Sequence, residues 1–290
     1  MSDEERNGRD DGTRGATTPA VIVVAGVDPG GGAGIAADVA ALAALGVRAA
    51  PVASALTVQT DRGVARVEPV DDELFALQLD AALESVGDAA RAVKTGLVVS
   101  RRHAELVAAA ARGRGLALVV DPILASGTGH RFVAGDPAEI LRPLLDAATM
   151  VTPNAAEAAA LCGTTWAARP DQLPELARAL ATDRRTAVVT AGDLRALDGQ
   201  GAETVLMAAA GPADDGTGAL RERRAEAPRV ERGKTHGTGC AFASTCAGLI
   251  ARGSSPLDAA VEAHRRVARA LALAGGLPGR RLSPEMWRVR

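Results

Sequence analysis

At 290 residues with 47% hydrophobic side chains, the chain is long enough for one large α/β domain or two small ones, and it can bury a large core. The 33 basic residues nearly balance the 35 acidic ones, and 2% of the residues are aromatic. Because there is no basic block and few aromatic side chains on which bases stack, the composition argues against nucleic acids or membranes as partners.

The ends of the chain and its cysteines indicate the environment of the protein. Residues 1–18 are polar and lack the apolar segment of a signal peptide, so we expect a disordered N-terminal tail. We expect a second, irregular tail over residues 276–290. Cys162, Cys240 and Cys246 are scattered, as in proteins of a reducing compartment, and no apolar run approaches the ~20 residues that cross a bilayer. These features predict a cytoplasmic protein.

Apolar runs of strand length alternate with helical periodicity along most of the body. In chain order we predict a strand at 21–26, a helix at 34–47, a strand at 49–60, a helix at 71–86, a strand and turn at 91–98, a helix at 102–115, a strand at 116–124, a helix at 136–145, a strand at 148–154, helices at 154–163 and 170–182, and a strand at 186–192. This order predicts βαβ crossovers, and hence a mostly parallel sheet with helices on both faces.

The pattern changes in the last third of the chain. Segments 203–209 and 223–231 flank the polar connection "AGPADDGTG", which predicts an antiparallel hairpin. Two helices follow, at about 239–252 and 256–274. Because no break in composition divides the body, we predict one domain over residues 19–275.

The stretch "KTHGTGCAFAS" places a bare glycine-rich turn directly before a helix. Gly237 and Gly239 permit a tight turn with uncovered backbone N–H groups, and such groups at a helix N-terminus attract anions. Cys240 falls in the first turn of the helix, where we expect the same field to lower the pKa of its thiol. The pattern suits phosphoryl transfer to a hydroxyl, with a base beside donors for the developing charge. The alternative is a plain helix start with a small buried cysteine.

A second glycine cluster, "DPGGGAGIAAD", follows the first strand. Three consecutive glycines allow a substrate to approach the backbone closely, and Asp38 in the following helix either faces that substrate or is an exposed carboxylate. The glycine spacing does not match the dinucleotide-binding pattern GxGxxG, so we do not predict a dinucleotide site.

Polar residues at the ends of other strands are further candidates, because ligands of parallel sheets bind beyond the carboxyl ends of the strands. Asn154 and Glu157 have the spacing of a capping box, and Glu157 alternatively lies near a metal-bound water of a nucleotide-phosphate site. The carboxamide of Gln59 suits the edge of an aminopyrimidine, unless this side chain is simply solvated. Lys94 either contacts a phosphate or extends to the surface.

Six segments together resemble the hydroxymethylpyrimidine/phosphomethylpyrimidine kinases of thiamine biosynthesis, which belong to the ribokinase-like superfamily. In order along residues 20 to 272, they are "AGVDPGGGAGIAADVAALAALGV", "SALTVQTDRGV", "VKTGLV", "VVDPILASG", "VTPNAAEAAALCG" and "THGTGCAFAS". The resemblance implies a three-layer ribokinase-like α/β fold and an ATP- and Mg²⁺-dependent kinase, with a homodimer as the expected assembly.

The resemblance also implies roles for single residues. Cys240 occupies the catalytic position, where most of the superfamily has aspartate, and Gly237 and Gly239 belong to the anion hole. Gln59 recognises the pyrimidine, in a pocket lined by Gly26, Gly32 and Asp38. ATP and Mg²⁺ are expected at Asn154, Glu157, Thr238 and Lys94, with Asp121 and Glu157 nearest the metal.

The chain departs from the family in two places. Where the family usually has a lysine, two glycines and a histidine, this sequence has Thr190, Ala191, Gly192 and Asp193. A cationic contact to the transferring phosphoryl group is therefore missing, unless Lys234 replaces it. The segment "ASGTGH", the expected lid over the substrate, also lacks the usual lysine before Ser-Gly.

Two alternative functions remain open from the sequence. The first is a kinase for a pyridoxal-type vitamin, against which Gln59 argues. The second is a catalytically weak ligand-binding protein on the same fold, which Thr190 favours and the intact "THGTGC" opposes.

Overall fold

A computed structural model describes residues 17–60, 63–125, 132, 136–165, 169, 171–191, 204–213, 217, 219–228 and 237–273. Several predictions concern residues outside this described part: nearly all of the N-terminal tail, the C-terminal tail, most of the expected lid, Gly192, Asp193 and Lys234. The predicted domain boundaries stay predictions. No helix of the described part is long and apolar enough to cross a membrane.

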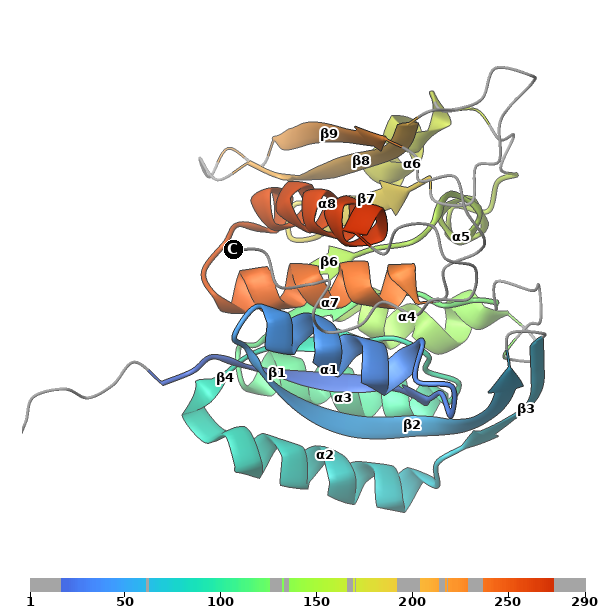
Figure 1. The fold of residues 1–290 in the computed structure, drawn as a ribbon, viewed down its shortest axis with the longest axis vertical. Helices are drawn as coiled ribbons and strands as arrows, with labels where there is room; N and C mark the ends of the chain where they lie inside the picture. Colours follow the sequence, from blue (N-terminus) through green and yellow to red (C-terminus); the bar gives the residue numbers. More distant parts are fainter. Residues whose placement is uncertain are drawn as a thin grey trace, which may run out of the picture.

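Nine strands of the described part form one sheet, in the order β3-β2-β1-β4-β5-β6-β7-β8-β9 (Figure 1). Their bounds are β1 (Ala20–Val27), β2 (Arg48–Thr60), β3 (Gly63–Pro69), β4 (Ala90–Thr95), β5 (Ala117–Val120), β6 (Met150–Val151), β7 (Thr186–Thr190), β8 (Thr204–Pro212) and β9 (Leu220–Pro228). The pairs from β2 to β7 are parallel, whereas β8 and β9 form an antiparallel hairpin beside β7. The predicted mostly parallel sheet with an antiparallel hairpin near its end is confirmed.

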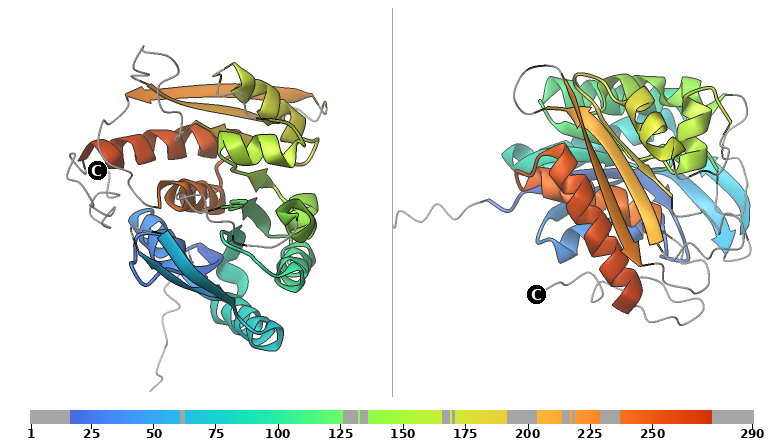
Figure 2. Two further views of the ribbon diagram at one scale, coloured as in Figure 1. Left: turned by 90° about the vertical axis from the view of Figure 1, so that its right-hand side faces the viewer. Right: turned by 90° about the horizontal axis from the view of Figure 1, so that it is seen from above.

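Helices cover both faces of this sheet, which confirms the predicted three layers (Figure 2). Their bounds are α1 (Gly34–Ala44), α2 (Asp72–Val86), α3 (Arg101–Gly113), α4 (Pro137–Ala147), α5 (Ala155–Leu161), α6 (Gln172–Leu180), α7 (Thr238–Ala251) and α8 (Pro256–Leu273), with a 3₁₀ turn at Gly87–Ala89. Alternate residues of β1 point to opposite layers: Ile22 packs with α2 to α6, and Val23 packs with α1, α7 and α8. This alternation is the period of two that a strand buried on both faces requires.

The edge strand β3 is absent from the sequence predictions. It pairs antiparallel with β2, and Gln59 lies opposite Val64. Most β3 side chains are exposed, so the apolar alternation that marks a buried strand is missing. Since the pairing of β1 with β2 ends at Leu56, the end of β2 that carries Gln59 is held by β3.

Helix α7 lies in the centre of its layer and is buried on nearly every side. It contacts α1, α8, β4 and β5, which explains why its sequence is apolar or small all round. A Cβ added to Gly248 would lie 2.6 Å from a methyl carbon of Leu45, so this side of α7 packs closely on α1. The first turn of α7 is thereby fixed near the carboxyl ends of the central strands.

Candidate functional site

The two glycine clusters of the sequence are in contact. Gly237, which precedes α7, has a φ of +86°, and an added Cβ would overlap the carbonyl oxygen of Gly32. Gly34, at the start of α1, has a φ of +57°, and an added Cβ would overlap the carbonyl oxygen of Gly26. Glycine is required at both positions for its positive φ and for its lack of a side chain. The predicted anion hole and the predicted substrate loop are thus adjacent.

The first turn of α7 offers backbone donors. Gly237 is the N-cap and makes no side-chain capping bond, so within the described residues no side chain caps this turn. A Cβ added to Gly239 would meet nothing within 4 Å, so the backbone there borders open space. The first N–H groups of this 14-residue helix have no intrahelical partner, which is the geometry that suits a phosphate group. The predicted position of Gly237, Thr238 and Gly239 at the start of a helix agrees with the structure, whereas binding of an anion there stays a prediction.

Asp28 organises the glycine-rich loop, and the sequence analysis assigned it no role. Its Oδ1 accepts a hydrogen bond from the Gly30 N–H at 2.8 Å, and its Oδ2 accepts bonds from Gly32 and Ala33, each at 2.9 Å. The side chain of Gln59 also acts to lower the pKa of Asp28. Burial raises the pKa of Asp28, but the bonds from Gln59 and the loop outweigh it and hold the pKa below its ordinary value. The sequence signal that could have predicted this role of Asp28 is an aspartate placed two residues before one glycine and four residues before another.

Asp38 and Lys94 form a buried ion pair. Both side chains are fully buried, and Lys94 Nζ lies 2.7 Å from Asp38 Oδ1. The Ser244 hydroxyl of α7 donates to the same oxygen at 2.8 Å. The interpretation that Lys94 extends to the surface is therefore wrong. A direct contact of Lys94 with phosphate, or of Asp38 with substrate, stays a prediction.

Cys240 and Asp121 lie beside this pair. Burial raises the pKa of the Cys240 thiol to about 12, although the Lys94 ammonium acts in the opposite direction. The expectation that the helix start lowers this pKa is wrong for the structure, because loss of hydration outweighs the helix field. Burial also raises the pKa of Asp121 to about 6, against the effects of Lys94 and a hydrogen bond from Cys240. The ligand-free site therefore holds a neutral thiol next to a carboxyl group.

Asn154 and Glu157 form the capping box of α5 that their spacing indicates. The Glu157 N–H donates to Asn154 Oδ1, and the Asn154 N–H donates to Glu157 Oε2, both at 2.9 Å. Thr190 at the end of β7 forms a bridge with Asn154. The position where the family usually has lysine is therefore adjacent to the predicted nucleotide-phosphate residues.

No three histidine, cysteine or acidic side chains in the described part of the chain gather closely enough to hold a metal by themselves. Asp121 Oδ2 is buried without a hydrogen-bond partner among the described residues, and it is therefore a free oxygen ligand. Magnesium in kinases characteristically binds one or two carboxylates together with waters and substrate phosphates. The residues present fit a Mg²⁺ ion that arrives with a nucleotide.

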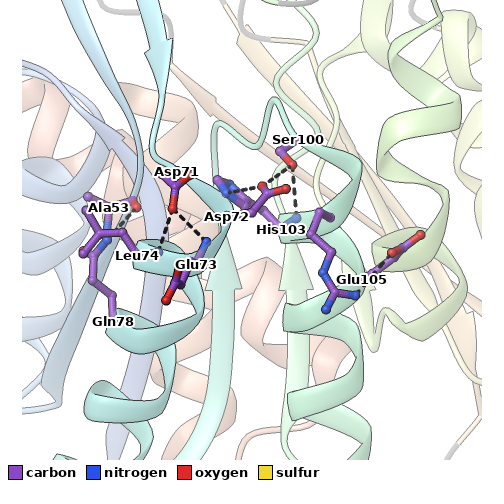
Figure 3. Close-up of polar contacts among 10 residues, drawn as sticks. Ala53, Asp71, Asp72, Glu73, Leu74, Gln78, Ser100, His103 and Glu105 are labelled. Carbon is purple, nitrogen blue, oxygen red and sulfur yellow. Dashed lines mark hydrogen bonds and ion pairs between the residues drawn. The ribbon is translucent and has the colours of Figure 1, made fainter.

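A separate polar cluster joins the N-termini of α2 and α3 (Figure 3). Asp71 caps α2, and Ser100 caps α3. His103 is buried, stacks on Phe75 and places Nε2 3.1 Å from an oxygen of Asp72. Two hollows of about 410 and 400 Å³ also lie along α2, and no predicted site residue lines them. The capping contacts support the starts of α2 and α3, and neither these contacts nor the two hollows belong to the predicted site.

The chain is similar to known proteins over most of its length. A family model described as phosphomethylpyrimidine kinase matches residues 28–282. A Rhizobium meliloti protein named hydroxymethylpyrimidine/phosphomethylpyrimidine kinase is 35% identical over 249 residues, covering 86% of this chain and 88% of that protein. A thiamine biosynthetic bifunctional enzyme of Arabidopsis thaliana is 36% identical over 256 residues, covering 87% of this chain and 46% of that protein.

Solved structures share the fold. The pyridoxal kinase from Staphylococcus aureus in complex with AMP-PCP and pyridoxal superposes with a TM-score of 0.74 and 24% identity, covering 92% of each chain. At this identity the likeness establishes the architecture and leaves the substrate to be argued from the site.

Proposed function

Because the chain belongs to the phosphomethylpyrimidine kinase family, we propose that it transfers the γ-phosphoryl group of ATP to 4-amino-5-hydroxymethyl-2-methylpyrimidine and then to its monophosphate, in the formation of thiamine diphosphate. The observation that carries the proposal is the contact of Gly237 with Gly32. It sets an anion-binding helix start directly against a glycine loop that a flat substrate can approach.

The Gly237–Cys240 turn holds the phosphoryl group in transit. Its N–H groups are fixed by the buried helix behind them, so they need little reorganisation as negative charge moves onto the transferring oxygens. Phosphoryl transfer leaves a protein little covalent work, and most of its contribution is positioning and electrostatics. The turn supplies both.

Cys240 accepts the proton of the hydroxymethyl group. In the ligand-free structure the thiol is neutral, and ionising it at pH 7 costs about 7 kcal/mol for a pKa of about 12. Because a neutral thiol cannot take a second proton, the thiol proton first passes to water, and the resulting thiolate then accepts the hydroxyl proton as the oxygen–phosphorus bond forms. The nearby Lys94 ammonium favours the ionised sulfur.

Substrate and nucleotide are held by different parts of the site. Gln59, Gly26 and Gly32 lie on the pyrimidine side, and Asp38 acts from behind the loop through Lys94 and Ser244. The nucleotide phosphates and the metal are held by Thr238, Asn154, Glu157 and Asp121. When bound, Mg²⁺ neutralises phosphate charge. Lys94 contributes its positive charge from its place beside Asp38.

We further propose a cytoplasmic homodimer. Cys162, Cys240 and Cys246 are free thiols in the structure, which supports a reducing compartment. Sedimentation of the full chain tests the assembly.

The test of the proposed function is phosphorylation of the hydroxymethylpyrimidine by purified full-length protein with Mg-ATP, with pyridoxal as the parallel substrate. We expect selective turnover of the pyrimidine, and a Cys240→Ala variant with kcat lower by about 10²- to 10⁴-fold, the usual contribution of a general base. Cys246→Ala removes a second buried thiol from the same helix and serves as the matched control. Turnover of pyridoxal alone, or binding of the pyrimidine without turnover, would overturn the proposal.

A further inference from the structure

Ser244 is the last residue of the stretch "KTHGTGCAFAS", and its side chain is fully buried on α7. Its hydroxyl donates to Asp38 Oδ1 at 2.8 Å, and Lys94 Nζ lies 2.7 Å from the same oxygen. Buried hydroxyls in helices commonly donate within their own helix, as Thr245 does to the Ala241 carbonyl oxygen. Ser244 instead bonds across to α1.

The acceptor of this bond is held in one orientation. Among the described residues, Asp38 Oδ2 is buried without a hydrogen-bond partner, so the two donors on Oδ1 orient the carboxylate. Lys94 belongs to β4, which is paired on both sides, with β1 and with β5. Hydrogen bonds to a carboxylate are stronger than those between neutral groups, and more so where water is excluded. The Ser244 hydroxyl is thus tied through Asp38 to a central strand of the sheet.

The bond lies one helical turn behind the two helix starts of the site. Cys240 precedes Ser244 by four residues on α7, and Gly34 precedes Asp38 by four residues on α1. Residues four apart share one face of a helix and lie about 6 Å apart along its axis. Gly34 ends the glycine loop, and its backbone rests on the Gly26 carbonyl oxygen. The bond therefore links the turn expected to hold the phosphoryl group with the loop expected to hold the pyrimidine.

Apolar packing of α1 on α7 is not directional. Gly248 packs on Leu42 and Leu45 near the other end of the helix pair, and contacts of this kind let two helices slide over each other. Within the described part of the chain, one other side-chain hydrogen bond joins these helices or their caps, from Arg252 to the Leu45 carbonyl oxygen. That bond lies at the C-terminal ends, away from the site. The Ser244 bond is the directional contact that lies near the site.

We propose that Ser244 is a positioning residue for phosphoryl transfer: through its bond to Asp38 it fixes the first turn of α7, which carries Cys240, against the first turn of α1, where the substrate loop ends. This inference rests on the proposed function, because it assumes that the phosphoryl group and the pyrimidine meet between these helix starts. A misplacement of about 1 Å between reacting groups can slow a reaction about 10²-fold. Loss of the hydroxyl should therefore slow the transfer itself.

The test compares the steady-state kinetics of full-length variants with Mg-ATP and the hydroxymethylpyrimidine. Ser244→Ala removes the hydroxyl and keeps the ion pair of Lys94 and Asp38, so no uncompensated charge is left in the core. We expect kcat to fall by about 10- to 100-fold, with the KM values for both substrates within about twofold of wild type. This split is expected for an interaction that acts only in the transition state. Ser244→Thr keeps a hydroxyl at this position and should recover most of the lost kcat.

Thr245→Val is the matched control. It removes the hydroxyl of the neighbouring buried residue at nearly constant shape, and the bond that it breaks stays within α7. It should leave kcat and KM unchanged. Equal losses of kcat in Thr245→Val and Ser244→Ala would reduce the effect to packing of α7 and overturn the inference. A Ser244→Ala enzyme with a raised KM and an unchanged kcat would overturn it as well.

A measurement on wild-type protein covers the case in which Ser244→Ala does not fold. In protein with ¹³C-labelled serine, the Ser244 hydroxyl proton should exchange with water much more slowly than that of exposed Ser85. Equal exchange at the two serines would refute the contact with Asp38. Pyrimidine turnover by wild-type protein together with an unchanged kcat in Ser244→Ala sinks this inference alone. Absence of pyrimidine turnover by wild-type protein sinks the proposed function, and this inference with it.

Discussion

The backbone of Gly237 rests on the carbonyl oxygen of Gly32 with no space for a Cβ between them. Two short glycine segments, each weak as a motif, are therefore one structural unit. The exclusion of side chains at this contact is what allows the helix start of α7 to reach the substrate loop.

A Gly237→Ala substitution should abolish activity and destabilise the fold. Its φ of +86° costs about 1 to 3 kcal/mol for a residue with a side chain, and displacement of the Gly32 backbone adds to that cost. Gly253→Ala is the control, since Gly253 has a φ of +97° but open space around an added Cβ. Urea unfolding and turnover of both variants check this. Equal losses of stability and activity in the two variants would contradict the importance of the glycine contact.

Removing Lys94 should be more damaging than removing the whole ion pair. Lys94→Met leaves Asp38 buried without its cation, which typically costs about 3 to 5 kcal/mol of unfolding free energy. In the Lys94→Met/Asp38→Leu double variant the uncompensated charge is gone, so part of the stability should return. A double-mutant cycle by denaturant unfolding measures this coupling. Strictly additive losses would show that the pair is not coupled as the 2.7 Å contact indicates.

Restoring the cation of the family should improve catalysis. Thr190 bridges Asn154 at the end of β7, so Thr190→Lys places an ammonium beside the expected phosphates. We expect at least a threefold rise in kcat/KM for ATP, since cationic contacts stabilise the transferring group. Thr164→Lys adds the same charge at an exposed position after α5 and should change nothing. An unaffected Thr190→Lys enzyme would indicate that another cation already fills this role.

His103 should contribute a loss of stability in mildly acidic solution. Burial lowers the pKa of His103 below its ordinary value of 6.5, although Asp72, the Val70 backbone and Asp71 act in the opposite direction. Below pH 6.5 the unfolded chain therefore binds a proton that the folded chain binds less readily, so stability falls as pH decreases from 6.5 toward the folded pKa. The contribution of neutral His103 to stability is fully present above pH 6.5.

His103→Gln removes the titrating group and should flatten this part of the stability profile, as measured by urea unfolding between pH 7 and pH 5. Wild-type and His103→Gln profiles with the same slope over that range would show that folding does not lower the pKa of His103.

Residues with a strong local pattern were predictable. The order of strands and helices follows from apolar periodicity, and the capping box of Asn154 and Glu157 follows from spacing. Edge strand β3 was missed because its side chains are mostly exposed. The Asp38–Lys94 ion pair joins residues 56 positions apart, so no local sequence pattern predicts it.

The protonation of Cys240 was predicted with the wrong sign for a related reason. The helix start is visible in the sequence, whereas the burial that raises the thiol pKa is a property of the assembled layers. Asp28 was missed although its Asp-x-Gly-x-Gly spacing was present, because its partner Gln59 lies on another element.

The hydrogen bond between Ser244 and Asp38 spans 206 positions of the chain. Contacts of such long range form late in folding, because the loop they close is long. A chain emerging from the ribosome therefore carries the substrate loop long before it has the turn that binds the phosphoryl group. Phosphoryl-transfer activity should therefore appear only after the final third of the chain has been synthesised. Until then the nascent chain carries the substrate loop but cannot transfer a phosphoryl group.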